Sequence, residues 1–473
     1  MKSIKVLCLI LAFILIVVGC ERELTKLPKQ GHNMAVTGVS VLSRGIQAGG
    51  KSMDNVADKI FTGDPNTSSR LGQTITLGKD INGDGYDDMI IGAPLYKENQ
   101  GRVYIYYGGE NPTFDVPDLT LTGEDIDNRF GHTIEMADFN NDNYADVAIG
   151  APGHNSFQGR AYIYYGGPDF DTTADKVFDG ETGTTGGFGK VAAGDMNNDG
   201  CADLLVSALW FDSKRGRVYL FYGAPGTDMD TVCDLTFDGE NPNDEFGRPP
   251  PSTGDVDGDH CDDVIIGTRD YPSGEEDGRA YLYYGAGGTR MDNICDLTFN
   301  PQTPHDEFAT IVDIFDIDND GFGDIIITAR RSDHYRGQVY LYWGNDRKSM
   351  DTTYDKCFTG EDNAPMLGSG LACGDINNDG YGDILLGGLN YPNGNLKGRA
   401  YLYYGNTKAL MDTTCDMIFF GENDQDRFGF DSAIGDINGD NFADVFIGAR
   451  SFKSNSWQGR AYLYYGGAPQ VID

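Results

Sequence analysis

The chain has 473 residues, of which 73 are acidic and 36 are basic, so its formal net charge is −37. This charge argues against nucleic acid or an anionic lipid surface as the main partner, because both are polyanions. The length exceeds what one ordinary hydrophobic core serves, so the chain must contain several domains or one repeated unit.

The N-terminus is typical of an export signal. Lys2 and Lys5 precede an apolar run, residues 6–18, that is too short to span a membrane permanently. The run leads to Val18-Gly19-Cys20, which resembles the lipobox of bacterial lipoproteins. The resemblance implies removal of residues 1–19 and lipidation of Cys20. The protein would then be exported and anchored in the cell envelope, at a bacterial-type outer membrane or cell surface. The alternative is a plain secretory signal with a chance cysteine.

The next segment, residues 20–52, contains Pro28, several Gly and scattered charges. We expect it to be a tether between the lipidated cysteine and the folded domain. The sequence also allows a short extra strand around residues 36–42. No other stretch of the sequence is long and apolar enough to cross a bilayer. Residues 53–467 are expected to form the domain, and residues 468–473 a C-terminal tail.

One motif, Asp-x-(Asn/Asp)-x-Asp-x-x-x-Asp, recurs seven times along the domain at intervals of 57 to 61 residues. Oxygen-bearing side chains occupy its positions one, three, five and nine, and the carbonyl of residue seven can turn inward. These five positions are, loop by loop, Asp80, Asn82, Asp84, Tyr86, Asp88; Asp138, Asn140, Asp142, Tyr144, Asp146; Asp195, Asn197, Asp199, Cys201, Asp203; Asp255, Asp257, Asp259, Cys261, Asp263; Asp316, Asp318, Asp320, Phe322, Asp324; Asp375, Asn377, Asp379, Tyr381, Asp383; Asp436, Asn438, Asp440, Phe442, Asp444.

Such a loop supplies the six or seven oxygens that Ca²⁺ prefers, and a solvated turn would not repeat this spacing seven times. We therefore expect about seven Ca²⁺ ions, one per loop. Their role should be mainly structural, because the carboxylates of one loop repel one another without a cation. Position six should be left-handed; it is Gly in four loops and Asn143, His260 or Asn441 in the others. An EF-hand does not fit, because β-type runs such as residues 89–91 follow the loop.

Each repeat contains four strand-like segments, as the second repeat illustrates. Residues 118–124 alternate, residues 133–137 lead into the Asp-rich loop, residues 146–152 are a continuous apolar run, and residues 159–166 are rich in Tyr. One such small sheet leaves both faces apolar, so it must stack on its copies. The sequence therefore predicts an all-β fold made of four-stranded antiparallel blades.

The two ends of the repeat array predict a closed ring. The domain starts with a lone alternating run, residues 58–63, and stops after the seventh Tyr-rich segment, so the last blade lacks one strand. Pairing these two ends completes the blade and leaves no open sheet edge. We expect a seven-bladed β-propeller that is closed by its N-terminal strand and is a monomer.

The repeat also carries a family signature. Phe130-Gly131 paired with Gly150-Ala151-Pro152 around an Asp-rich loop resembles the FG-GAP repeat of the integrin α-subunit propeller and its bacterial relatives. Later repeats depart from it, with Phe308-Ala309 and Gly448-Ala449-Arg450. The resemblance covers about residues 53–467. It implies a seven-bladed propeller with cation loops on one face and a ligand face at the opposite end.

An export context permits disulfides, and two pairs of cysteines lie at similar spacings of 32 and 34 residues. Cys201 and Cys261 hold position seven of consecutive loops, while Cys233 and Cys295 precede the fourth strands of the same blades. Both positions lie at the same end of an antiparallel blade. We therefore predict disulfides between Cys201 and Cys233 and between Cys261 and Cys295, provided that the Cα atoms lie within about 7 Å.

Aromatic residues recur four positions after the start of the Gly-Ala-Pro element, and packing of each connecting turn explains them better than a sugar-binding platform does. They are Tyr96, Phe211, Tyr271, Tyr391 and Phe452. Residues of these turns without a repeat pattern are better candidates for the ligand face. They are His154, Trp210, His334 and Trp457.

No catalytic constellation is recognisable in the sequence: six His are scattered, and no nucleophile elbow or phosphate loop occurs. We predict a surface-anchored, calcium-binding and non-enzymatic module that binds an unknown extracellular protein or glycan. One alternative is an extracellular polysaccharide-active lyase or hydrolase on a propeller scaffold, and another is a structural envelope protein. Integrin-like propellers suggest the first function only by analogy, since a fold does not fix a function.

Overall fold

Seven antiparallel sheets, one for each repeat, account for the domain in the computed structural model. The structure describes residues 39–43 and 53–467, except residues 289, 364, 454 and 455. The predicted signal peptide, Cys20 and the C-terminal tail lie outside these residues. Within the described part of the chain, no helix combines the length and the apolar character needed to cross a bilayer.

Blades 1 to 7 are numbered in chain order, and their strands run from the ring centre outward. They are β3 (Thr74–Lys79), β4 (Asp88–Ala93), β5 (Arg102–Tyr106), β6 (Leu119–Thr122); β7 (Ile134–Ala137), β8 (Asp146–Ala151), β9 (Arg160–Tyr164), β10 (Lys176–Asp179); β11 (Phe188–Gly194), β12 (Asp203–Ala208), β13 (Arg217–Phe221), β14 (Leu235–Asp238); β15 (Ser252–Gly254), β16 (Asp263–Thr268), β17 (Arg279–Tyr283), β18 (Leu297–Phe299); β19 (Phe308–Phe315), β20 (Asp324–Ala329), β21 (Gln338–Tyr342), β22 (Lys356–Thr359); β23 (Leu367–Gly374), β24 (Asp383–Gly388), β25 (Arg399–Tyr403), β26 (Met417–Phe420); β27 (Phe428–Gly435), β28 (Asp444–Ala449), β29 (Arg460–Tyr464), β2 (Lys59–Gly63) and β1 (Val39–Ser43).

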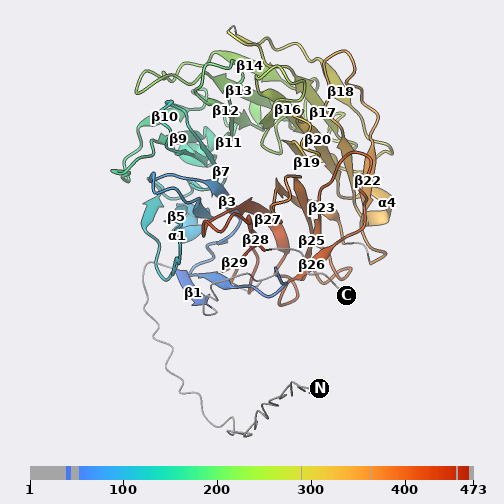
Figure 1. Ribbon diagram of the computed structural model, residues 1–473. Coiled ribbons are helices and arrows are strands. Elements are labelled where there is room, and N and C mark those ends of the chain that lie inside the picture. Colours follow the sequence, from blue (N-terminus) through green and yellow to red (C-terminus); the bar gives the residue numbers. More distant parts are fainter. Residues whose placement is uncertain (1–38, 44–52, 289, 364, 454–455, 468–473) are drawn as a thin grey trace, which may run out of the picture. The chain divides into compact units, whose positions relative to one another are not determined.

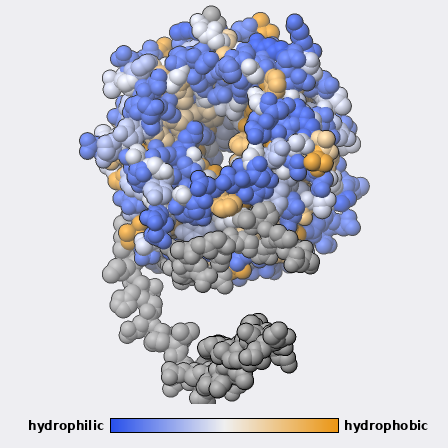
Figure 2. Space-filling model, in the orientation of Figure 1, coloured by the Kyte–Doolittle hydropathy of each residue, from blue (hydrophilic) through white to orange (hydrophobic). Residues whose placement is uncertain are grey.

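The innermost strands of neighbouring blades contact one another around the whole circle, from β3 through β7, β11, β15, β19 and β23 to β27 and back to β3. Figure 1 shows the resulting ring of blades around a central axis. The surface seen in Figure 2 is largely hydrophilic and is hollowed at the centre of the ring. The predicted all-β, seven-bladed propeller is confirmed.

The hydrophobic core consists of seven layers, each between two adjacent blades. The second strand of every blade is buried along its entire length, which explains why the sequence shows continuous apolar runs there. Between blades 2 and 3 the backbones approach closely, where Gly159 forms a parallel bridge with Phe188. A Cβ atom on Gly159 would lie 1.9 Å from the Phe188 carbonyl oxygen, so only glycine fits.

Among the described residues, four short helices occur as single turns in the connections between second and third strands, and the sequence did not predict them. They are α1 (Tyr96–Asn99), α2 (His154–Phe157), α3 (Phe211–Lys214) and α4 (Ser332–Tyr335). Their central residues have left-handed φ angles, for example Lys97 and Glu98 at 41° and 56°. Such turns have no amphipathic period that a sequence could reveal.

The N-terminal strand closes the ring as predicted, because β2 pairs antiparallel with β29 and opposes Phe61 to Ala461. Blade 7 has a fifth strand as well: β1 pairs with β2 from Val39 to Ser43. The segment expected to be a tether therefore includes a strand, close to residues 36–42, where the sequence allowed one. This strand covers the outer edge that β2 would otherwise expose.

The closure depends on Phe61, whose ring is fully buried and lies 5.1 Å from the ring of Tyr106 and 5.6 Å from that of Phe446. We expect Phe61→Ala to lower the free energy of unfolding by about 3–5 kcal/mol, because it removes contacts to blades 1 and 7 together. Urea denaturation followed by fluorescence measures this loss. Phe420→Ala, at a ring that is 47% exposed, is the control and should cost about 1 kcal/mol or less. Equal losses in the two variants would contradict the closure.

Candidate metal centres and the opposite face

All seven Asp-rich loops connect the first strand of a blade to its second, so they lie at one end of the ring, here called the loop face. In every loop the carboxylate at position one accepts a hydrogen bond from the backbone N–H of position six, as between Asp80 and Gly85 at 2.7 Å. The carboxylate at position five accepts from the N–H of position seven. Position six is left-handed in all seven loops, with φ between 68° and 91°, which confirms that prediction.

The aspartate at position nine is fully buried in every loop. In blade 1, Asp88 accepts hydrogen bonds from the N–H of Ile81 in the loop and of Gly108 after the third strand, both at 2.8 Å. The same pair of bonds occurs in the other six blades. Burial raises the pKa of Asp88 to about 7 and that of Asp146 to about 8. A cation beside these carboxylates would favour their charged form.

The donor atoms of the loops fit a hard cation. Loops 4 and 5 each bring three carboxylates together, with ligand oxygens that all lie within 4.8 Å of one another. These triplets are Asp255, Asp257, Asp263 and Asp316, Asp318, Asp324. The other five loops have Asn at position three, which replaces one carboxylate with a neutral oxygen donor. Clustered carboxylate and amide oxygens are the ligands that Ca²⁺ takes in proteins.

Loops 4 and 5 also contact a basic side chain of the next blade. Arg347, which follows β21, pairs with Asp257 and lies 2.6 Å from Asp259. Lys408, which follows β25, lies 2.8 Å from Asp320 and 3.9 Å from Asp318. These are the two loops with an additional Asp at position three, so the extra negative charge coincides with a positive charge from the neighbouring blade. The sequence analysis did not identify Arg347 and Lys408 as partners of these loops. The additional Asp at position three of loops 4 and 5 was the signal that could have indicated them.

The repeated aromatic residues pack under arginines at the opposite end of the ring. In five blades the guanidinium of the first residue of the third strand lies 3.3 to 4.0 Å from the centre of this ring. In blade 3, for example, Arg217 covers Phe211 and lies 2.9 Å from Glu181, which follows the fourth strand of blade 2. The rings therefore support arginines of their own blade, such as Arg217 that reaches the neighbouring blade, and do not form an open platform.

The end that carries these turns, and the connections from each fourth strand to the next first strand, is here called the opposite face. The four candidate ligand residues all lie in these turns but do not come together. His154 takes the place of the repeated aromatic in blade 2, and burial lowers its pKa. Trp210 packs edge-on against Phe157 at 5.3 Å. The side chain of His334 is 97% exposed, and Trp457 lies under Arg70.

The predicted disulfides are wrong in this structure, where all four cysteines are free. Cys201 and Cys261 are buried beneath the turn that follows the third strand. The thiols of Cys233 and Cys295 instead approach backbone carbonyls, those of Leu235 and Leu297, at 3.0 and 3.1 Å. The third strand of the blade lies between the two positions. Two strand spacings amount to about 10 Å, which exceeds the reach of a disulfide.

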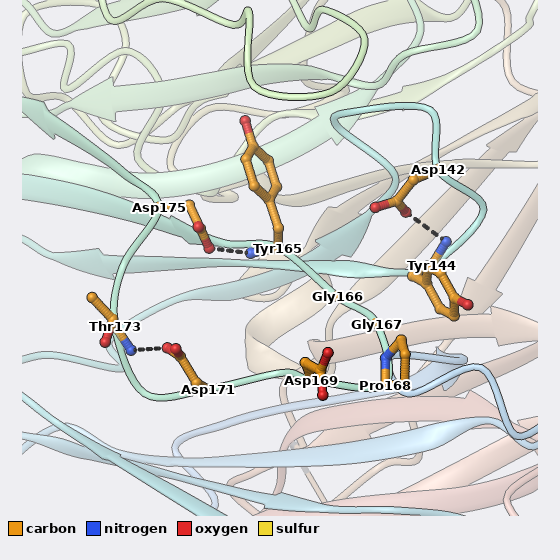
Figure 3. A pocket seen from close by; sticks show the side chains of 10 residues that line it. All are labelled: Asp142, Tyr144, Tyr165, Gly166, Gly167, Pro168, Asp169, Asp171, Thr173 and Asp175. Carbon is orange, nitrogen blue, oxygen red and sulfur yellow. Dashed lines mark hydrogen bonds between the residues drawn. The ribbon is translucent and has the colours of Figure 1, made fainter.

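Two surface pockets among the described residues each include residues that the sequence predicted to be functional, Asp142 of the second loop in one and His154 in the other. One, of about 470 Å³, lies on the loop face between the second Asp-rich loop and the turn after β9. Figure 3 shows Asp142, Asp169, Asp171 and Asp175 around it, with Asp175 accepting a hydrogen bond from the Tyr165 N–H. The other pocket, of about 680 Å³, lies on the opposite face around His154.

A closed seven-bladed propeller with an Asp-rich loop in each blade defines the structural class of this protein. The FG-GAP repeat profile matches residues 71–106, 130–164, 189–221, 251–283 and 428–464, and the FG-GAP-like repeat profile matches residues 316–386. The chain belongs to the FG-GAP repeat proteins.

Among curated proteins, the chain is similar to integrin α subunits. Integrin alpha-IIb of Mus musculus is 34% identical over 32% of this chain, and integrin alpha-8 of Mus musculus is 32% identical over 41% of it. Phosphatidylinositol-glycan-specific phospholipase D of Rattus norvegicus is 33% identical over 33% of the chain. The matched regions span only 16%, 19% and 21% of these three relatives, respectively. The likeness therefore concerns the propeller and not the whole relatives.

The contact between Arg347 and loop 4 can be tested in the absence of divalent cations. Because Asp257 is buried, we expect Arg347→Ala to lower the free energy of unfolding by about 1–3 kcal/mol in a chelator. Millimolar Ca²⁺ should reduce this loss, since a bound cation would replace the missing guanidinium. Arg290→Ala, at an arginine that is 70% exposed beside Asp234, is the matched control and should cost less than about 1 kcal/mol. An equal loss in both variants would contradict this interpretation of the contact.

Proposed function

We propose that this protein is a surface-anchored, calcium-binding propeller that acts as a non-enzymatic binding or adhesion module for an extracellular protein or glycan. The main support is the regular FG-GAP ring, in which the similarity to integrin α subunits lies. Lipidation of Cys20 would hold the ring at a membrane surface. The binding surface in this proposal is the opposite face, where the connections vary from blade to blade while the Asp-rich loops stay regular.

Calcium has a structural role in this proposal. Each loop gathers carboxylates whose mutual repulsion a cation would relieve, and the buried aspartate at position nine joins the loop to its blade. The same loops contact the next blade, for example through the Gly167 N–H and the Ile81 carbonyl oxygen at 2.7 Å. A cation held in a loop would therefore stiffen the blade and its junction to the following one.

Thermal unfolding with and without a chelator tests the structural role of Ca²⁺. At a free Ca²⁺ concentration of ten times Kd, each site adds about 1.4 kcal/mol, so seven sites would add about 10 kcal/mol. We expect a large fall in Tm when the chelator is added and full recovery with excess Ca²⁺. Mg²⁺ should restore less, because it favours a smaller, octahedral oxygen shell. An unchanged Tm would refute the structural role.

A binding assay that also measures turnover tests the proposed activity. The protein, prepared without residues 1–20, is applied to arrays of extracellular proteins and glycans, and each ligand that binds is then assayed for cleavage. We expect saturable binding to at least one ligand without turnover. Cleavage of a bound polysaccharide would instead establish the lyase or hydrolase alternative. Failure to bind any arrayed ligand, with the ring shown to be folded, would contradict a binding module and favour a structural envelope protein.

The similarity to the phospholipase D does not favour an enzyme. It covers 33% of this chain and only 21% of that relative. In the described residues, the two triplets of carboxylates close enough to share a cation belong to Asp-rich loops 4 and 5. The phospholipase D activity that this relative's name states is therefore a property of that relative and is not part of this proposal.

A further inference from the structure

Four arginines on the opposite face have no carboxylate partner among the described residues, in a protein whose net charge is −37. Arg427, Arg70 and Arg129 occupy the same position in blades 7, 1 and 2, directly before the Phe-Gly or Leu-Gly pair. Arg450 follows β28 of blade 7, at a position that is Pro94 and Pro152 in blades 1 and 2 but Arg269 and Arg330 in blades 4 and 5. They are here called the arginine cluster. It spans three consecutive blades across the point where the ring closes.

The backbone holds three of these arginines in equivalent places. Arg70, Arg129 and Arg427 have left-handed φ angles of 52°, 56° and 55°. Each donates its N–H to a carbonyl in the preceding blade's connection between second and third strands, for example Arg129 to Asn99 at 2.7 Å. A left-handed non-glycine residue is strained, so neighbouring contacts must fix it. The side chains therefore start from fixed points on the opposite face, beside the preceding blade.

The guanidinium groups are partly buried and close enough to repel one another. Burial, together with Arg427 and Arg129, lowers the pKa of Arg70 to about 10. Burial, together with Arg427, Arg70 and Arg330, lowers the pKa of Arg450 to about 9. Asp431 exerts a smaller opposing effect on Arg450, and this carboxylate already accepts a hydrogen bond from the Ile75 N–H at 2.9 Å.

The cluster also contains hydrogen-bond donors that the protein does not use. The Nε atoms of Arg70, Arg129 and Arg450 are buried and have no partner among the described residues. A side-chain hydrogen bond of Arg70 reaches the neutral Gln73 at 3.3 Å.

Buried donors without a partner are rare in native proteins. The Nε atoms of Arg331 and Arg399 are also without a partner among the described residues, but their other nitrogens pair with Glu307 and Glu361. The arginines of the cluster have no such carboxylate in the described part of the chain, so an external acceptor can bind there.

Blades 4 and 5 show how the same face neutralises arginines internally. The position that is arginine in blades 7, 1 and 2 is Glu245 in blade 4 and Glu307 in blade 5. Glu307 pairs with Arg330 and lies 3.1 Å from Arg331, while Glu245 pairs with Arg248. The chain can thus supply acids at this position and does so on one side of the ring. On the other side, the position adds positive charge.

Aromatic rings adjoin the arginine cluster. The guanidinium of Arg70 lies 4.1 Å from the ring centre of Trp457, which is 37% exposed. Arg450 lies 3.4 Å from the ring centre of Phe430, and Arg129 lies 5.0 Å from that of Phe157. Planar guanidinium groups bind carboxylate and sulfate through paired hydrogen bonds, and a partly exposed tryptophan offers a flat apolar surface for a sugar ring.

We propose that the arginine cluster, with Trp457, is a binding site for an acidic glycan, in which the guanidinium groups hold a carboxylate or sulfate group of the sugar. The inference rests on the proposed binding function and assigns its ligand class. The overall negative charge opposes the approach of a polyanion, so recognition depends on contacts at the cluster and not on long-range attraction. An acidic peptide offers the same carboxylate without a sugar ring, and the test distinguishes the two.

Titration with an oligogalacturonate, followed by calorimetry and Trp fluorescence, tests this site. We expect binding that weakens with added salt, and no binding of the methyl-esterified oligosaccharide, which lacks the charge. A carrageenan oligosaccharide, which carries sulfate but no carboxylate, is the second arm and shows whether carboxylate or sulfate is preferred. Arg70→Gln and Arg129→Gln should each weaken binding about tenfold or more, because each removes charge-assisted hydrogen bonds. Arg70→Lys should fall between Arg70→Gln and the wild type.

Arg290→Gln is the matched control, since it removes one positive charge from the loop face, and it should leave the affinity unchanged. The two cluster variants should keep their Tm or raise it, because they relieve repulsion, so a loss of binding would not reflect unfolding. Equal binding of the charged and esterified oligosaccharides, or wild-type affinity in both variants, would overturn the site. Binding of an oligoglutamate but of neither acidic glycan would overturn the ligand class. Each of these outcomes leaves the proposed binding function standing if another ligand binds elsewhere.

Discussion

The propeller depends on the hydrogen bonds that the buried aspartate at position nine of each loop accepts. Its carboxylate accepts one N–H from its own loop and one from the glycine after the third strand, so it joins three segments of the blade. The loop backbone in turn bonds to the next blade, as where the Ala145 N–H donates to the Asp80 carbonyl oxygen at 2.8 Å. A buried carboxylate is stable only with such partners or a cation. The loops are therefore joints of the ring as well as candidate metal centres.

The fold could be predicted from the sequence because its signals repeat. Alternating and apolar runs recur in a fixed order seven times, and the surplus strand at one end matches the missing strand at the other. The left-handed conformation of position six was also predictable, because Gly, Asn or His occupies this position in all seven loops. The loop oxygens were predicted as ligands from spacing alone. The two backbone hydrogen bonds to the aspartate at position nine were not predicted, because one of them comes from a glycine twenty or more residues away.

The failures concern contacts that spacing does not encode. Cys201 and Cys233 share an end of their blade, but the third strand separates them laterally, and a sequence position does not give that distance. Arg347 reaches loop 4 from the next blade, 90 residues from Asp257. The arginine cluster could have been found by comparing one position across the repeats, since Arg70, Arg129 and Arg427 all precede the Phe-Gly or Leu-Gly pair. The sequence alone does not show that these arginines lack a carboxylate, because pairs such as Arg330 with Glu307 join residues of different connections.

The two faces of the ring are electrostatically separate, which limits what Ca²⁺ can do for ligand binding. A strand of six residues spans about 20 Å, while the Debye length at physiological salt is about 8 Å. A cation bound on the loop face is thus screened from the arginine cluster at the other end of the strands. Its influence must pass through the structure, by holding each loop against its blade and its neighbour. The arginine cluster depends on that rigidity more than most of the surface, because it is assembled across blades 7, 1 and 2, where the ring closes through the pairing of β2 with β29.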